Sequence, residues 1–93
     1  MTPIVHAGVD TLSLRQLDVL NAAPKGTTFK AFRRCESQLR EGVDYFYLPA
    51  DEHAELIARL KAAQQVYATT VNLLLLTRVG YARLQQLLAD VAG

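Results

Sequence analysis

The residues of this sequence best suited to chemistry are the cations between positions 25 and 40, where five lysines or arginines stand against one acid, Glu36. If this stretch is helical, spacing of i, i+3, i+4 and i+7 places four polar side chains on one face. These side chains are Lys30, Arg33, Arg34 and Ser37. Arginine can donate two hydrogen bonds to guanine O6 and N7, while lysine and hydroxyl groups hold phosphates. The stretch therefore predicts a surface that contacts nucleic acid.

Residues at the two ends of this stretch are candidates for contacts with the DNA backbone. They are Lys25, Thr27, Thr28 and Arg40. The threonines at the helix start could also present backbone N–H groups to a phosphate. The same pattern is typical of an amphipathic helix whose cations are only solvated, so both readings stay open. The lack of an acid at i+4 on the basic side, and the turn that precedes it, favour the nucleic-acid reading.

The side chains needed for other kinds of chemistry are absent or poorly placed. One cysteine and two distant histidines, His6 and His53, cannot build a standard zinc site. His53 follows Asp51 and Glu52, but neighbouring residues of a helix point in different directions. Cys35 falls on the apolar side of its helix, which favours a small buried side chain over a nucleophile. We expect no enzyme, no metal site and no cofactor.

Length and composition predict one domain over residues 1–93, with its core at 11–91 and a frayed tail at 1–10 that contains His6. The net charge is +1, but five acids and no cation occupy positions 41–55, so the chain is dipolar rather than neutral. No apolar run is long enough to span a membrane. The N-terminus lacks the features of a secretory signal, and a lone cysteine fits a reducing cytoplasm.

The basic stretch sits in a predicted helix-turn-helix. Ser13 and Gln16 form a capping-box pattern that starts a helix reaching about Ala22. A four-residue turn over 23–26, Ala-Pro-Lys-Gly, ends it. The second helix is predicted from Thr27 or Thr28 to about Arg40, with its apolar residues turned inward. The residues expected on that inner side are Phe29, Phe32, Cys35 and Leu39.

The rest of the chain predicts two strands and two helices. The aromatic run at 44–48 is typical of a strand, and 71–76 is expected to pair with it antiparallel. Between them, a helix at 51–63 would bury Leu56, Ile57 and Leu60. A final helix from Thr77 to about Val91 completes an α+β domain of about four helices and a two-stranded antiparallel sheet.

The junction between the last strand and last helix carries a resemblance. Residues 76–81, LTRVGY, and residues 42–46, GVDYF, are similar to motifs of phage antirepressor N-terminal DNA-binding domains, the KilA-N, Bro-N and Rha-type group. The resemblance implies phage or prophage origin, DNA binding and a role in transcription regulation, as in repression or lysis–lysogeny control. Physics offers an architectural role as well: Thr77 can cap the helix, Gly80 permits close backbone approach, and Arg78 can pair with Asp44 or Asp51.

Two functional classes follow from these observations. The first is a small phage-type DNA-binding regulator, which would bind two half-sites as a homodimer. The dimer contact could come from Leu87, Leu88 and Val91 on the last helix, although their spacing favours packing in the core of the domain. The alternative is a phage-encoded protein-binding inhibitor or adaptor without DNA affinity, anti-CRISPR-like or repressor-binding. Its partner would be a host or phage regulatory protein, and its acidic stretch at 41–55 could imitate nucleic acid.

Overall fold

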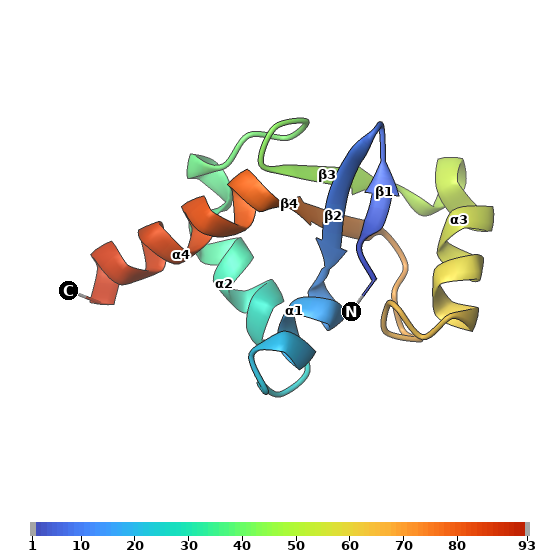
Figure 1. Cartoon of the computed structure of the whole chain (residues 1–93), viewed down its shortest axis with the longest axis horizontal. Helices are drawn as coiled ribbons and strands as arrows, with labels where there is room; N and C mark the ends of the chain where they lie inside the picture. Colours follow the sequence, from blue (N-terminus) through green and yellow to red (C-terminus); the bar gives the residue numbers. More distant parts are fainter. Residues whose placement is uncertain (1, 93) are drawn as a thin grey trace.

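The structure is a computed structural model that describes residues 2–92, with side chains described as far as residue 90. Its strands are β1 (Ile4–His6), β2 (Val9–Ser13), β3 (Tyr45–Leu48) and β4 (Leu73–Thr77). Its helices are α1 (Leu14–Leu20), α2 (Thr27–Cys35), α3 (Ala50–Ala62) and α4 (Arg78–Ala92), with a short 3-10 helix, η1 (Glu36–Gln38), after α2. The α+β class was predicted correctly (Figure 1).

The sheet has four strands in the order β1-β2-β4-β3, so the predicted two-stranded sheet is wrong. The additional strands form a hairpin where a frayed tail was expected. Ala7 and Gly8, at its turn, have φ of 52° and 75°, the pair of positive values that a tight two-residue hairpin turn needs. His6 is consequently ordered in β1, with its ring centroid 4.8 Å from that of Phe46 and 6.3 Å from that of His53.

The predicted antiparallel pairing of the other two strands is confirmed. Tyr45 lies opposite Leu76, and Leu48 lies opposite Leu73. Because alternate residues of a strand face opposite sides of the sheet, the leucine run in β4 serves both faces. Leu73 and Leu75 enter one hydrophobic cluster, whereas Leu76 enters the other.

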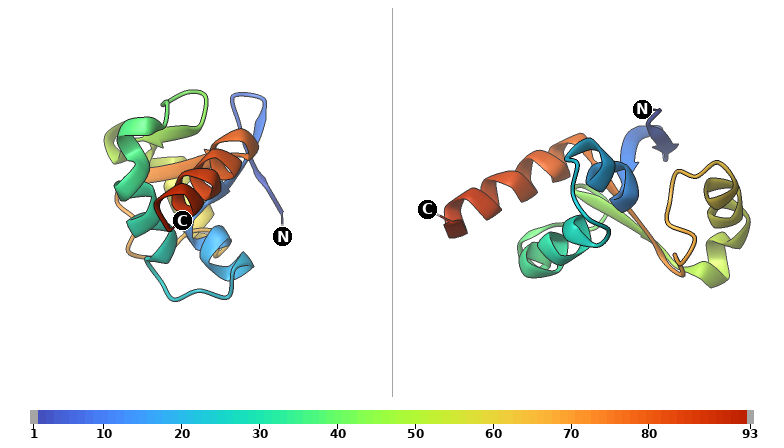
Figure 2. Two further views of the ribbon diagram at one scale, coloured as in Figure 1. Left: turned by 90° about the vertical axis from the view of Figure 1, so that its left-hand side faces the viewer. Right: turned by 90° about the horizontal axis from the view of Figure 1, so that it is seen from below.

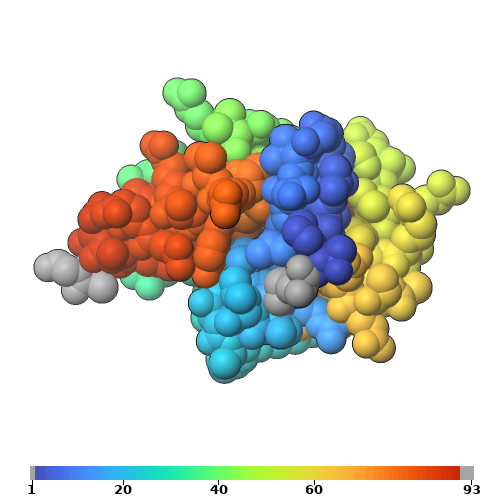
Figure 3. Space-filling view, viewed as in Figure 1, coloured from blue at the N-terminus to red at the C-terminus, as the bar shows by residue number. Residues whose placement is uncertain are grey.

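The two clusters lie on opposite faces of the sheet. α3 covers the first cluster, through Ile57 and Leu60, and the helices α1, α2 and α4 surround the second (Figure 1). The second cluster contains Leu17, Phe32, Cys35, Leu39, Leu76 and Leu84. In the space-filling view, the β1–β2 hairpin lies between the α4 side and the α3 side (Figure 3). Cys35 is 2% exposed, as its place on the apolar side of α2 predicted.

The start of α4 confirms the architectural reading of the LTRVGY motif. The Gly80 N–H donates to Thr77 Oγ1 at 2.9 Å, so Thr77 caps the helix. A Cβ on Gly80 would lie 1.7 Å from the Asp44 carbonyl oxygen, which itself accepts a hydrogen bond from the Thr77 N–H at 3.0 Å. Arg78 is exposed, and no ion pair joins it to another described residue, so its predicted pairing with Asp44 or Asp51 is wrong.

The two helices of the predicted helix-turn-helix are present, but both are shorter than expected. α1 ends at Leu20 rather than Ala22, and α2 begins at Thr27 after a connection that spans 21–26. α2 ends at Cys35 rather than Arg40, because the chain tightens there into η1. The Ser13–Gln16 capping box at the start of α1 is confirmed in both directions. Among the described residues, no helix is long and apolar enough to cross a membrane.

Candidate nucleic-acid interface

α2 is held against the domain by one side, which leaves its other side open to solvent. Thr28, Phe32 and Cys35 are its buried residues, spaced i, i+4 and i+7. The Phe32 ring meets the Tyr45 ring of β3 edge-on, with centroids 4.9 Å apart. In the right-hand view of Figure 2, α2 lies at the surface on the side away from the β1–β2 hairpin.

The outer side of α2 carries the predicted cations. Lys30, Arg33 and Arg34 are exposed, and Ser37 is exposed in η1. We call these four residues the α2 basic face. The one ion pair among the described residues joins Arg33 Nε to Glu36 Oε1 at 3.6 Å, with the two side chains 66% and 44% exposed. An exposed pair at this distance contributes at most about 1 kcal/mol, so it leaves Arg33 free to exchange partners.

Phe29 does not lie on the buried side, as the sequence predicted; its side chain is 43% exposed. The buried line of α2 runs through Thr28 instead of Phe29, because Thr28 is drawn inward by a carboxylate. The Thr28 N–H and hydroxyl both donate to Asp18 Oδ1, at 2.8 Å and 2.6 Å. Leu39 is buried as predicted, although it lies beyond the end of the helix.

Asp18, in α1, caps the N-terminal end of α2. Its carboxylate is 1% exposed and also accepts hydrogen bonds from the Gly26 N–H at 3.1 Å and the Tyr67 hydroxyl at 2.5 Å. A carboxylate is favoured at this end of a helix, where unpaired N–H groups point outward. Thr28 is therefore occupied inside the protein and is not available to a phosphate. We call Asp18 with its partners Gly26, Thr28 and Tyr67 the Asp18 clasp.

The protonation states of the clasp follow from its geometry. Burial acts to raise the pKa of Asp18, but the hydrogen bonds from Thr28, Tyr67 and Gly26 outweigh it and lower the pKa below 3.8. Burial raises the pKa of Tyr67 to about 12, aided by the hydrogen bond to Asp18 and by its negative charge. Near neutral pH, an ionised carboxylate thus holds a neutral phenol.

The sequence analysis did not predict the part that Asp18 and Tyr67 play in positioning α2. A usable signal existed for Asp18, since it follows Leu17 and lies four positions after Leu14, on the side of α1 that faces the core. An acid on a buried face needs hydrogen-bond donors. No comparable signal marked Tyr67, because it lies in the segment between α3 and β4 and reaches Asp18 across 49 positions of sequence.

The remaining predicted backbone contacts have different surroundings. The Lys25 ammonium donates to Thr69 Oγ1 at 2.9 Å and lies 5.0 Å from the centroid of the Tyr67 ring. Lys25 therefore points toward the segment before β4. Thr27 is exposed, with its hydroxyl donating to the Pro24 carbonyl at 2.8 Å. Arg40 is exposed beyond η1, and its backbone N–H donates to Asp44 Oδ2 at 2.8 Å.

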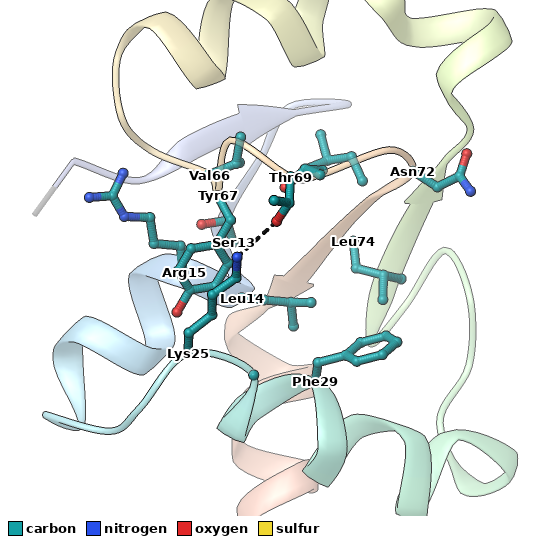
Figure 4. A pocket seen from close by; sticks show the side chains of 13 residues that line it. Ser13, Leu14, Arg15, Lys25, Phe29, Val66, Tyr67, Thr69, Asn72 and Leu74 are labelled. Atoms are coloured by element: carbon teal, nitrogen blue, oxygen red, sulfur yellow. Dashed lines mark hydrogen bonds between the residues drawn. The ribbon is translucent and has the colours of Figure 1, made fainter.

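A cavity of about 300 Å³ adjoins the N-terminal end of α2 (Figure 4). Its apolar walls include Leu14, Phe29 and Leu74, whose side chains converge from α1, α2 and β4 in the close-up view. Lys25 and Arg15 are the charged residues that line it. We call this cavity the Lys25 pocket.

The predicted dimer contact on α4 is partly used within the domain. Leu87 and Leu88 are half-buried and pack against the cluster of α1, α2 and α4. The side chain of Val91 lies outside the described residues. The homodimer stays a prediction.

Comparison with known proteins found no relative of this chain. No family model, no curated protein and no solved structure matches the chain. The antirepressor resemblance therefore remains a prediction that rests on the two short motifs, and a functional conclusion has to come from the geometry around α2.

Proposed function

We propose that this chain is a small cytoplasmic DNA-binding regulator of phage or prophage type, which contacts duplex DNA through the α2 basic face. The observation that carries the proposal is the placement of Lys30, Arg33 and Arg34 on the open side of a helix whose other side is buried. A helix of this kind fits the major groove, where guanidinium groups can read guanine. Ser37 and Lys30 would add contacts to phosphates.

The way α2 is held supports the same function. A recognition helix loses less entropy on binding when its orientation is already set in the free protein. The Asp18 clasp fixes the N-terminal end of α2, and the Phe32–Tyr45 contact fixes its middle. The cations can then meet DNA with adjustment of their own side chains alone.

The interface proposed from the structure is smaller than the one predicted from the sequence. Thr28 is excluded because both of its donors are bound to Asp18. Arg40 remains as an exposed candidate for phosphate contacts. Thr27 is exposed, but its N–H and its hydroxyl both donate to the Pro24 carbonyl, and Lys25 faces the pocket beside the helix. One helix supplies modest affinity, so we propose a homodimer on two half-sites of DNA.

A salt titration of DNA binding tests the proposal. The wild-type protein is titrated onto a short fluorescein-labelled duplex of mixed sequence between about 50 and about 200 mM salt. On a duplex of mixed sequence the two arginines would contact phosphates, so Arg33→Ala with Arg34→Ala should weaken binding and reduce the slope of log K against log salt by about two. The matched control is Arg59→Ala with Arg83→Ala, which removes the same charge from exposed positions on α3 and α4.

The control variant should keep the wild-type slope. If the Arg33/Arg34 variant binds as the wild type does, or if both variants lose the same affinity, contact through α2 is wrong. Absence of any binding at the lowest salt would reject DNA as the partner. That result would favour the alternative function, a protein-binding inhibitor or adaptor without DNA affinity.

A further inference from the structure

We propose that the Lys25 pocket binds a small apolar molecule that carries one negative charge, such as an aromatic carboxylate. The pocket lies between α1, α2, β4 and the segment 66–72. No residue of the α2 basic face lines it, although Phe29, which precedes Lys30 in α2, does. Its volume of about 300 Å³ is at the lower end of the range for small-molecule sites. This ligand site goes beyond DNA binding and does not depend on it.

The walls of the pocket favour an apolar ring or chain. Leu14 and Leu74 are half-buried, and Phe29 is 43% exposed, so each has apolar surface that an occupant would remove from water. Figure 4 shows these three side chains pointing toward a common space below the segment that carries Thr69. Val66 and Tyr67 also line the cavity. Contacts of this kind favour a flat or branched hydrocarbon group.

The charged residues that line the pocket favour a negatively charged ligand. Arg15 and Lys25 line it, and no aspartate or glutamate does. The Arg15 guanidinium points away from Leu14, Phe29 and Leu74 in Figure 4, so Lys25 is the cation that would meet the ligand. The Lys25 ammonium is held in place by Thr69 Oγ1 and by the face of the Tyr67 ring. Neither of these partners is a carboxylate, and an ammonium has three N–H donors, so donors remain for an anion. No ion pair of Lys25 exists within the described part of the chain.

Asp18, the buried acid of the clasp, forms no ion pair with either cation of the pocket. Asp18 lies outside the pocket lining, and its two oxygens already accept four hydrogen bonds within the clasp. The Arg15 guanidinium donates through Nη1 to the Gln64 carbonyl at 2.6 Å, a neutral acceptor. Neither cation at the pocket is therefore paired with a carboxylate among the described residues. An apolar anion can make apolar contacts with the walls and also be attracted by the positive charge. A neutral or cationic analogue can make the apolar contacts alone.

Three indoles that differ in charge test this site by two-dimensional amide NMR. Indole-3-acetate is the anion, indole-3-acetamide its neutral isostere, and tryptamine the cation. Indole-3-acetate should shift the amide signals of Gly26, Phe29 and Thr69 with a dissociation constant of about 1 mM. It should bind about fivefold more tightly than the amide, and tryptamine should bind most weakly.

Two lysine variants locate the charge that matters. Lys25→Met should bring the affinity for indole-3-acetate down to that of the amide. Lys30→Met, an equal change on the α2 basic face, should keep the full preference for the anion. Thr69→Val, which removes the hydrogen-bond partner of the ammonium, should reduce the preference in part.

The proposal is overturned by equal binding of the anion and the amide, by a preference that survives Lys25→Met, or by no shift with any of the three compounds at about 10 mM. Because no DNA is present, failure here leaves the proposed DNA contact standing. Failure of DNA binding likewise leaves this site standing.

Discussion

The Tyr67 hydroxyl donates a 2.5 Å hydrogen bond to Asp18 Oδ2 and so joins the segment before β4 to the first helix. The same carboxylate receives the N-terminal end of α2 through Gly26 and Thr28. Three parts of the chain thus meet at one buried charge. The orientation of α2, and with it the α2 basic face, depends on that charge.

Replacement of Asp18 by asparagine should destabilise the protein by about 3 kcal/mol, since hydrogen bonds to a buried charge are lost and an amide NH₂ faces existing donors. Urea unfolding followed by circular dichroism measures this loss. Asp10→Asn is the matched control, because Asp10 is exposed in β2 and should change stability by less than about 0.5 kcal/mol. Equal stability of the two variants would contradict the role of the clasp.

The lowered pKa of Asp18 sets the acid limb of the stability curve. The carboxyl has its ordinary pKa of 3.8 when unfolded and a lower pKa when folded. Its stabilising contribution is therefore complete above pH 3.8 and is lost as the pH falls through the folded value. Unfolding free energies of the wild type and Asp18→Asn should converge as the pH falls below 3.8. A constant difference between them at all pH values would refute this linkage.

The raised pKa of Tyr67 sets a matching alkaline limb. Its pKa is 10.0 when unfolded and about 12 when folded, so its contribution is complete below pH 10 and declines as the pH rises toward 12. Tyr67→Phe should remove this decline and show a shallower loss of stability over that range. Tyr47→Phe, at a largely exposed tyrosine, provides the comparison. Identical alkaline limbs for wild type and Tyr67→Phe would argue against the shift.

Gly80→Ala should destabilise α4 and the sheet by about 3 kcal/mol or more, because the new methyl group would overlap the backbone of Asp44. The sign is diagnostic, since alanine in place of glycine normally stabilises a helix interior by about 1 kcal/mol. Ala82→Gly, at an exposed position of the same helix, should cost about 1 kcal/mol. Thermal unfolding of the three proteins measures both effects. A more stable Gly80→Ala protein would show that the backbones can separate.

Features set by neighbouring residues were predictable from the sequence. The Ser13–Gln16 capping box and the cap that Thr77 gives to α4 depend on contacts only a few positions apart. The strand predicted at 71–76 is present as β4, Leu73–Thr77. The hairpin of β1 and β2 was missed because its turn uses Ala7 and Gly8, and alanine is an unusual residue at positive φ.

Features set by distant contacts were not predictable. The helical periodicity predicted that Phe29 is buried. Hydrogen bonds from Thr28 to Asp18 instead place Thr28 on the buried side of α2 and leave Phe29 exposed. The end of α2 at Cys35 could not be predicted, because no glycine or proline lies directly after it in the sequence. The cations Lys30, Arg33 and Arg34 were placed correctly at the surface, because their exposure follows from charge as well as from position.

The central place of β4 in the sheet governs the order in which the protein can assemble. β4 pairs with β2 on one side and β3 on the other, yet it is the last strand to be synthesised. Until residues 73–77 leave the ribosome, the early hairpin and β3 have no common neighbour. Closing such long loops is slow, so the sheet should form only after residues 73–77 are available to join β2 to β3.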